Sequence, residues 1–178
     1  MSLRLQHVDA AGFSPWLDAA VDIYVTALER PVEVTAPRRV STREHLVEPG
    51  FRAVLVLDGD ELVGFAYGYH DVPGQWWHDV VVEALPLELG LRWLARAFQV
   101  TEIHLLPSHQ GQGLGRRLLG ELVRGVDRDT VVLSAYDQPT RALTLYRALG
   151  FTALLTRFRF PGNVELYQVL ARDLPLED

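Results

Sequence analysis

The sequence contains no cysteine and no lysine, and each absence excludes a class of chemistry. Without cysteine the chain has no disulfide, no thiolate metal site and no cysteine nucleophile. All 17 basic residues are arginine, which excludes the phosphate-binding lysine of a P-loop and any lysine acting as a base or forming a Schiff base. Long apolar runs are also missing, since no stretch approaches the roughly 18 residues of a membrane span.

The charge and length predict a soluble cytoplasmic protein with one domain over residues 1–178. The formal net charge of −6 argues against nucleic acid as a partner, because nucleic-acid-binding proteins usually present a basic face. Charged residues stand near the N-terminus, where a signal peptide needs an apolar stretch. Four arginines nevertheless gather in one short stretch, where a solvated helix face would explain them equally well: Arg116, Arg117, Arg124 and Arg128.

Hydrophobic periodicity predicts a mixed α/β fold, with a mainly antiparallel central sheet flanked by helices. The predicted strands are residues 3–8, 52–57, 61–69, 100–106, 130–135, 152–160 and 164–171. Helices are predicted after Ser14-Pro15, after Ser41, over residues 78–97 with a break near Pro86, from about Gly113, and over residues 139–149. Residues 31–39 are predicted to form a loop, and Ser41 with Glu44 has the spacing of a capping box. In the last helix Ala142, Leu145 and Leu149 are expected to face inward.

A glycine-rich turn between a strand and an amphipathic helix is the strongest chemical signal. Residues 107–115 read Pro-Ser-His-Gln-Gly-Gln-Gly-Leu-Gly, and glycine lets successive backbone N–H groups point the same way. These groups add to the unpaired N–H groups and the positive dipole of the following helix. The turn therefore predicts a pocket for phosphate or pyrophosphate, although a tight connection without a ligand would use glycine too.

Two common phosphate motifs are absent from this turn. The Rossmann fingerprint needs glycine where Arg116 stands, and the P-loop needs Gly-Lys-Ser/Thr. What remains is Gln110-x-x-Gly113-x-Gly115, which resembles the pyrophosphate signature of the GCN5-related N-acetyltransferase (GNAT) family. Residues 142–151, Ala-Leu-Thr-Leu-Tyr-Arg-Ala-Leu-Gly-Phe, resemble that family's later A-x-x-L-Y-x-x-x-G-F motif. Pro139 stands where the family often has asparagine, so an asparagine contact to the cofactor is not expected.

The resemblance implies a GNAT-like fold with splayed strands and acetyl-CoA as the acyl donor. The backbone amide of Leu105 is expected to stabilise the oxyanion that develops on the thioester, and the Tyr146 hydroxyl to protonate the departing thiolate. The cofactor is expected to bind the end of the strand, the turn and the start of the helix, at Leu105, Leu106, Gln110, Gly111, Gln112, Gly113, Leu114, Gly115 and Arg116. Spacing alone is equally consistent with Tyr146 as a core aromatic residue.

A general base is needed because the attacking amine must be neutral, whereas an alkylamine is mostly protonated at pH 7. Glu102 is the first candidate, since it lies on the cofactor-binding strand three residues before Leu105. Strand alternation puts His104 on the same face, which makes it the second candidate, with water as a third. Both side chains are equally plausible as polar residues that face solvent. Tyr67, His70, Trp76 and Trp77 are candidates for the acceptor side.

The sequence thus predicts an acetyl-CoA-dependent N-acetyltransferase that acts by direct transfer to an amine in a ternary complex. The alternatives are an acyl-CoA-binding sensor without turnover and a different α/β nucleotide-binding protein. No metal site is expected, because the six histidines are scattered without an i, i+4 pair. The identity of the amine is not predicted, and a homodimer is left open.

Overall fold

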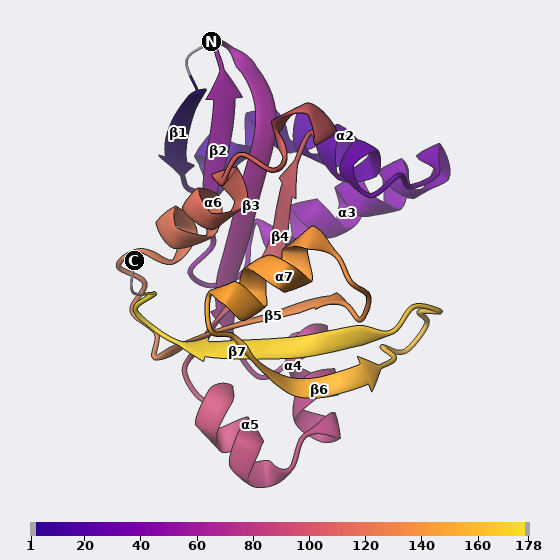
Figure 1. Cartoon of the computed structure of the whole chain (residues 1–178), viewed down its shortest axis with the longest axis vertical. Helices are drawn as coiled ribbons and strands as arrows, with labels where there is room; N and C mark the ends of the chain where they lie inside the picture. The colour runs from indigo at the N-terminus through magenta and orange to yellow at the C-terminus, as the bar shows by residue number, and fades with distance from the viewer. Residues whose placement is uncertain (1–2, 177–178) are drawn as a thin grey trace. The chain divides into compact units, whose positions relative to one another are not determined.

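The computed structural model describes residues 3–176, which contain a seven-stranded sheet flanked by helices (Figure 1). The strand order is β1-β2-β3-β4-β5-β7-β6. Antiparallel pairing joins β1 to β2, β2 to β3, β5 to β7 and β6 to β7, whereas β4 and β5 are parallel. The predicted fold class is confirmed. The strands are β1 (Leu3–Val8), β2 (Arg52–Asp58), β3 (Glu61–Asp71), β4 (Ala97–Leu105), β5 (Thr130–Tyr136), β6 (Thr152–Phe158) and β7 (Tyr167–Asp173).

The helices of the described residues are short. Over residues 3–176, no helix has the length and apolar character that crossing a membrane requires. The α-helices are α1 (Ala10–Phe13), α2 (Leu17–Ala27), α3 (Thr35–His45), α4 (Trp76–Ala84), α5 (Leu87–Trp93), α6 (Leu114–Val123) and α7 (Arg141–Ala148). The 3₁₀ helices are η1 (Ser14–Trp16), η2 (Val32–Val34) and η3 (Pro107–His109).

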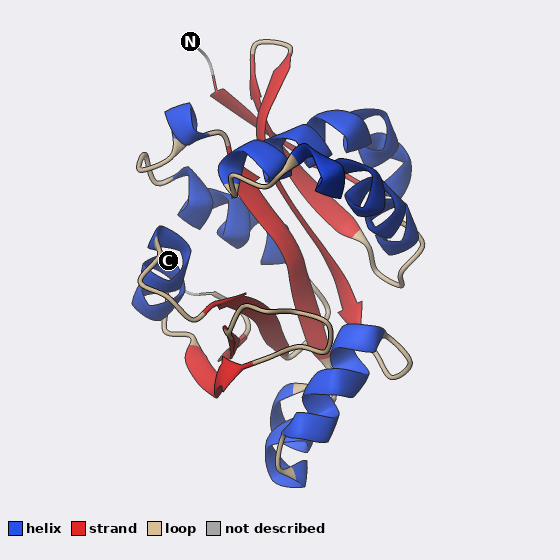
Figure 2. Ribbon diagram, turned by 90° about the vertical axis from the view of Figure 1, so that its right-hand side faces the viewer, coloured by secondary structure: helices blue, strands red, loops and turns tan. Residues whose placement is uncertain are grey.

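The chain forms two compact units, of which the first comprises residues up to Tyr69 together with Thr101–Leu122. In this unit α6 lies on one face of the strands, and α2 and α3 lie on the other (Figures 1 and 2). Strand alternation builds the core on the α2 side, where every second residue of β2 and β3 points inward. Phe13, Ala20 and Ile23 pack there against Ala53, Leu55, Leu57, Phe65 and Tyr67.

The second unit comprises His70–Val100 and the chain from Val123 onward. Its core is formed by α4, α5 and the strands β5 and β7, with Trp77 and Val81 packed against Val132, Val169 and other apolar residues. A single domain over residues 1–178 stays a prediction.

The region of residues 31–45 differs from the prediction. Residues predicted to form a loop lie in η2 and the first turn of α3, and Pro37 is accommodated because it stands near the helix start. The predicted capping role of Ser41 is therefore wrong, because Ser41 lies inside α3 and its hydroxyl donates to the carbonyl of Arg38. Helix α3 contains few apolar residues, so hydrophobic periodicity alone does not predict its first turns.

Three smaller predictions are also corrected. The helix predicted to continue to residue 97 ends at Trp93, because fully buried Ala97 and Phe98 already pair with β5 as part of β4. In α7 the buried residues are Leu143 and Tyr146, whereas Ala142 is exposed and Leu145 is half-buried. The predicted inward position of Leu149, directly after α7, is confirmed. The helix predicted from Ser14 begins as η1 and continues as α2. The alternation of Leu3–Val8 and the Asp-Gly turn between β2 and β3 are confirmed.

Candidate active site

The glycine turn connects β4 to α6 in the first unit, as the sequence predicts. Gly111 and Gly113 adopt positive φ angles of 75° and 77°, a region that residues with a Cβ rarely enter. A Cβ at Gly113 would meet no heavy atom within 4 Å, so this position needs glycine for its backbone conformation and not for lack of space. The exposed turn thus presents its backbone to solvent immediately before the N-terminus of α6.

The end of β4 leaves one backbone amide directed away from β3. The Leu106 amide donates to the Val63 carbonyl at 2.9 Å, so alternation along the chain turns the preceding N–H group, that of Leu105, toward the opposite edge. The Gln110 side-chain amide donates to the Leu105 carbonyl at 3.0 Å and thereby ties the turn to the strand end. The predicted cofactor residues from Leu105 to Arg116 are therefore contiguous around one strand-to-helix junction.

Gly64 on β3 permits the close approach of β4 at this junction. A Cβ at Gly64 would lie 2.4 Å from the Leu105 side chain and 3.0 Å from the His104 carbonyl oxygen. A side chain at this position would force the end of the Leu105 side chain to move and would crowd the β4 backbone at His104, so glycine permits the close approach of the two strands.

Glu102 is the centre of a buried polar cluster on the α2 and α3 side of β4. Its Oε1 accepts from Arg38 at 2.6 Å, and its Oε2 lies 2.5 Å from His104 Nε2. The Glu102 and His104 side chains are only 11% and 12% exposed. The predicted common face of Glu102 and His104 is confirmed by this contact. A second nitrogen of Arg38 donates to the Tyr24 hydroxyl at 2.7 Å, and the guanidinium lies 4.0 Å from the centre of the Tyr24 ring.

The surroundings of Glu102 favour its ionised form. Burial alone would raise the pKa of Glu102, but the hydrogen bond and charge of His104, together with Arg38 and His45, outweigh burial and lower it. Burial lowers the pKa of His45, whose Nδ1 lies 2.9 Å from the Tyr67 hydroxyl. Burial also raises the pKa of Tyr67 well above its ordinary value. At neutral pH the cluster therefore holds the ionised Glu102 carboxylate and the Arg38 guanidinium beside the neutral phenol of Tyr67 and the neutral imidazole of His45.

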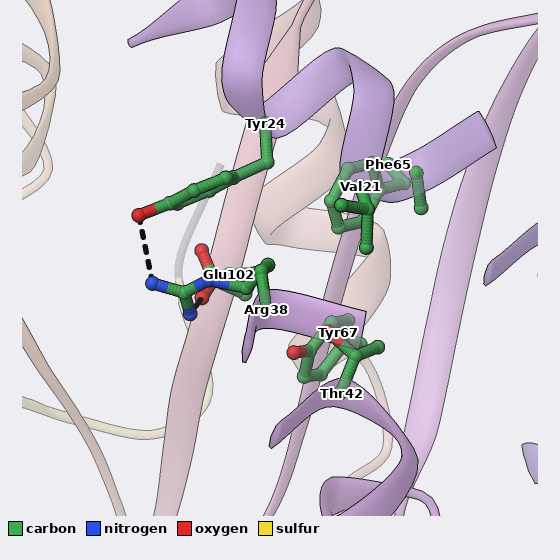
Figure 3. A pocket seen from close by; sticks show the side chains of 8 residues that line it. Val21, Tyr24, Arg38, Thr42, Phe65, Tyr67 and Glu102 are labelled. Atoms are coloured by element: carbon green, nitrogen blue, oxygen red, sulfur yellow. Dashed lines mark hydrogen bonds and ion pairs between the residues drawn. The ribbon is translucent and has the colours of Figure 1, made fainter. Parts of the chain in front are cut away.

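These residues line a pocket between α2, α3, β3 and β4 (Figure 3). The pocket has about 190 Å³ of space, including open solvent at its mouth. Its polar walls are formed by Tyr24, Arg38, Thr42, Tyr67 and Glu102. Ala20, Val21 and Phe65 form its apolar walls. The sequence identified Tyr67 and Glu102 but missed Tyr24, Arg38 and Thr42. Arg38 was missed because residues 31–39 were predicted to form a loop, whereas α3 begins at Thr35.

Tyr146 lies in the second unit, on the inward face of α7. Its side chain is buried with 4% exposure, and its ring packs 5.6 Å from that of Phe151. Thr140 caps the helix by accepting from the Leu143 amide at 3.1 Å. The packing with Phe151 unites two residues of the motif at 142–151.

The other candidates for the acceptor side also lie in the second unit. His70 Nδ1 lies 2.5 Å from an Arg128 nitrogen, and Trp77 donates to the Ser134 hydroxyl at 3.3 Å. The exposed Trp76 ring lies 5.7 Å from the Phe160 ring. Among the described residues no cluster of three or more potential ligands could hold a metal ion, and the absence of a metal stays a prediction.

Comparison with known proteins places these features in a family. A family model described as an acetyltransferase (GNAT) domain matches residues 49–153. Over 90% of this chain and 92% of the other, the sequence is 33% identical to the GCN5-like protein acetyltransferase Rv2170 of Mycobacterium tuberculosis. The chain belongs to the GNAT acetyltransferase family. The resemblance carried by the motifs at residues 110–115 and 142–151 is thus confirmed.

Two further comparisons extend the similarity of this GNAT protein. The chain is 38% identical over 63 residues to the N-alpha-acetyltransferase RimI of Mycobacterium tuberculosis. This match covers 35% of this chain and 40% of the other. Its fold is similar to that of yncA from Salmonella typhimurium, whose structure contains acetyl-CoA. That similarity has a TM-score of 0.66 at 17% identity and covers 99% of this chain and 96% of the other.

Proposed function

We propose that this protein transfers an acetyl group from acetyl-CoA to an amine by direct attack within a ternary complex. The observation that carries the proposal is the turn at residues 110–115, whose glycines adopt positive φ between β4 and α6 in a chain of the acetyltransferase family. The acetyl-CoA in the structure of yncA supports the same donor. A cytoplasmic location belongs to the proposal, while a homodimer is left open.

The donor would bind around the junction of β4 and α6. The N–H groups of Gln110, Gly111, Gln112, Gly113, Leu114 and Gly115 would hold the pyrophosphate, aided by the positive end of the α6 dipole. Arg116 is exposed in the first turn of α6, where it would add positive charge for the phosphates. Leu105 and Leu106 would contact the pantetheine arm through their backbone.

The chemical step needs three groups. The amine nitrogen attacks the thioester carbonyl carbon, the carbon–sulfur bond breaks, and the proton lost by nitrogen is balanced by the one gained by the thiolate. The Leu105 amide would stabilise the oxyanion, a contribution of about 3 kcal/mol for a well-placed donor. Tyr146 would protonate the thiolate, a role that rests on the match of residues 142–151 to the family motif.

Glu102 would receive the amine proton, with His104 as its partner in the same hydrogen-bonded pair. The 2.5 Å contact between the two side chains makes His104 the second candidate for the base, and the charge of Arg38 helps to lower the pKa of Glu102. Water is the remaining alternative for the base.

Thiol release from acetyl-CoA, measured with purified protein and a panel of amines, tests the proposal. The expected result is release that depends on both the amine and the enzyme. Binding of acetyl-CoA without release from any amine would instead identify an acyl-CoA-binding protein without turnover, whereas no binding at all would refute the assignment of the turn.

A further inference from the structure

The pocket beside Glu102 is too small to hold a substrate. Once open solvent is left out, it has room for about one water molecule. Arg38 lines this pocket, so a substrate of the size of an amino acid does not fit beside its guanidinium there. The function of Arg38 therefore lies in its contacts with protein groups.

Arg38 connects helix α2 to strand β4 (Figure 3). One of its guanidinium nitrogens donates to Oε1 of Glu102 at 2.6 Å, and the other donates to the Tyr24 hydroxyl at 2.7 Å. The guanidinium also lies 4.0 Å from the centre of the Tyr24 ring, which is a cation–π contact. Because the N–H groups of a planar guanidinium point in fixed directions, these contacts together hold it in one orientation.

The Glu102 carboxylate is held from two sides. Arg38 donates to Oε1, and His104 Nε2 lies 2.5 Å from Oε2. The side chains of Arg38, Glu102 and His104 are only 28%, 11% and 12% exposed, so water does not replace these partners easily. Without Arg38, Oε1 would lose its partner inside the protein, and the carboxylate would rotate or take up a proton.

Arg38 is also a permanent cation beside Glu102. Burial raises the pKa of Glu102, whereas the charges of His104, Arg38 and His45 lower it. An imidazole loses its charge as the pH rises, but a guanidinium stays charged at every working pH. The titratable groups around Glu102 come from four elements: Tyr24 from α2, Arg38 and His45 from α3, Tyr67 from β3, and His104 from β4.

We propose that Arg38 is a positioning residue for the acetyl transfer: anchored on Tyr24, it holds the Glu102 carboxylate in the orientation that accepts the proton of the attacking amine. The proposal rests on the proposed function, in which Glu102 is the base. The carbon–nitrogen bond forms as the carbon–sulfur bond breaks, the amine proton passes to Glu102, and the thiolate gains a proton from Tyr146. Arg38 itself gains and loses no proton, because it acts through Glu102.

Two variants of Arg38 separate its charge from its packing. Arg38→Met keeps an unbranched apolar stem but removes the charge and the donors, whereas Arg38→Lys keeps the charge. With an amine that the parent acetylates, we expect kcat of Arg38→Met to fall by about tenfold or more while both KM values change by less than about twofold. Arg38→Lys should recover about one third of the parent kcat or more. A parent-like kcat in Arg38→Met, or a change confined to KM, would overturn the proposal.

The matched control is Arg39→Met. Arg39 follows Arg38 in α3, but it pairs with the exposed Asp18 at 2.7 Å. This variant removes an arginine from the same helix without touching Glu102, so we expect the kcat of the parent. An equal loss of kcat in Arg39→Met would assign the effect to helix α3 as a whole and would overturn the specific role of Arg38.

The pH dependence of the rate provides a readout that lost packing alone does not move. Rates are divided by the neutral fraction of the amine, so that the remaining acid limb reports the base. We expect this limb to lie about one pH unit or more higher in Arg38→Met than in the parent, because a nearby opposite charge lowers a carboxyl pKa by about 1–3 units. Arg38→Lys should return it to within about half a unit of the parent. Coinciding limbs in the parent and Arg38→Met would overturn the proposal.

The ionisation of Glu102 is also measurable without any substrate. Titration of the carboxyl carbon by NMR, in protein labelled with ¹³C-glutamate and assigned with Glu102→Gln, should give a higher pKa for Glu102 in Arg38→Met than in the parent. An unchanged pKa in a parent that releases thiol would overturn the role of Arg38 and leave the acetyl transfer intact. No thiol release from the parent with any amine would instead refute the proposed function.

Tyr24→Phe keeps the test decisive if Arg38→Met does not fold. It removes only the hydroxyl that anchors Arg38 and keeps the ring beneath the guanidinium. We expect the acid limb to move in the same direction by a smaller amount, with a smaller loss of kcat. A parent-like limb and kcat in both Tyr24→Phe and Arg38→Lys would then overturn the proposal.

Discussion

Glu102 is the proposed general base, and among the described residues it is the one carboxylate that lines the pocket. Glu102→Gln keeps the size of the side chain but removes the charge and the ability to accept a proton. We expect kcat to fall by about 10²-fold or more, and the pH–rate profile to move to higher pH, where the amine loses its proton without help. Thiol release between pH 6 and 10 measures both effects.

The control for this change is Glu61→Gln, at the exposed start of β3. A Glu102→Gln profile that coincides with that of the parent would remove Glu102 from the mechanism. If His104→Asn moved the profile instead, the proton would be assigned to the imidazole.

Tyr146 is expected to affect turnover more than binding. Tyr146→Phe removes only the hydroxyl and keeps the ring that packs on Phe151. A thiolate with a pKa near 8.5 needs little help to leave, so we expect kcat to fall by about 10- to 100-fold with little change in acetyl-CoA affinity. Steady-state kinetics and calorimetric titration with acetyl-CoA measure the two quantities. A loss of affinity with an unchanged kcat would assign Tyr146 to packing or cofactor binding.

Asp71 is a second buried carboxylate, and its behaviour is opposite to that of Glu102. Burial raises the pKa of Asp71 to about 6, although His78, whose Nδ1 lies 2.6 Å from Oδ2, partly counteracts the rise and Asp79 adds to it. Because the pKa of Asp71 is higher in the folded than in the unfolded chain, protonated Asp71 stabilises the folded state relative to ionised Asp71. This stabilisation is fully present below about pH 4, is lost as the pH rises through 6, and amounts to about 3 kcal/mol at most.

Asp71→Asn tests this dependence because asparagine cannot ionise. We expect the free energy of unfolding of the parent to fall relative to that of the variant between pH 4 and pH 7. Urea denaturation at several pH values measures the difference. Asp60→Asn, in the exposed turn between β2 and β3, is the control. A constant difference between parent and Asp71→Asn across this range would refute the prediction.

The junction of β4, the glycine turn and α6 is the proposed binding site for the donor. Gly113→Val forces a β-branched residue into positive φ and places a side chain where the pyrophosphate would approach. We expect acetyl-CoA to raise the melting temperature of the parent but not that of this variant. Thermal denaturation with and without acetyl-CoA measures the shift.

Gly120→Ala is the matched control for the same element. Gly120 lies inside α6, and a Cβ there would meet no heavy atom within 4 Å. Alanine should stabilise the helix by roughly 0.5–1 kcal/mol while the shift with acetyl-CoA persists. A full shift in Gly113→Val would contradict the assignment of the turn to pyrophosphate.

The whole chain has no cysteine that could form an acetyl thioester and no lysine that could be acetylated. We therefore expect direct transfer, in which both substrates bind before thiol is released. Initial-rate plots are expected to intersect, and incubation with acetyl-CoA alone should leave the protein mass unchanged. Parallel plots, or an internal acetyl adduct that forms rapidly and is discharged by added amine, would contradict direct transfer. Slow labelling of the N-terminal α-amine is the one expected exception.

Local patterns were sufficient to predict the fold class and the glycine turn between β4 and α6. Each of these patterns involves only a few neighbouring residues, so it can be recognised in the sequence. Examples are the alternation in Leu3–Val8, the Asp-Gly turn, and the repeat of Leu114, Leu118 and Leu122. The glycines of the turn are equally local, because the positive φ at Gly111 and Gly113 is a property of the backbone itself.

The pocket around Glu102 is formed by contacts between distant parts of the chain. Arg38 and Glu102 are 64 positions apart, and no spacing in the sequence indicates that they form an ion pair. The start of α3 was missed because its polar residues carry little helical periodicity, and with it Arg38 was placed in a loop. Burial of Glu102 and its lowered pKa likewise depend on α2, α3 and β3 closing around β4. Sequence therefore determined the elements and the turn, whereas the charge state of the pocket required packing, because desolvation and ion pairing arise only when distant residues meet.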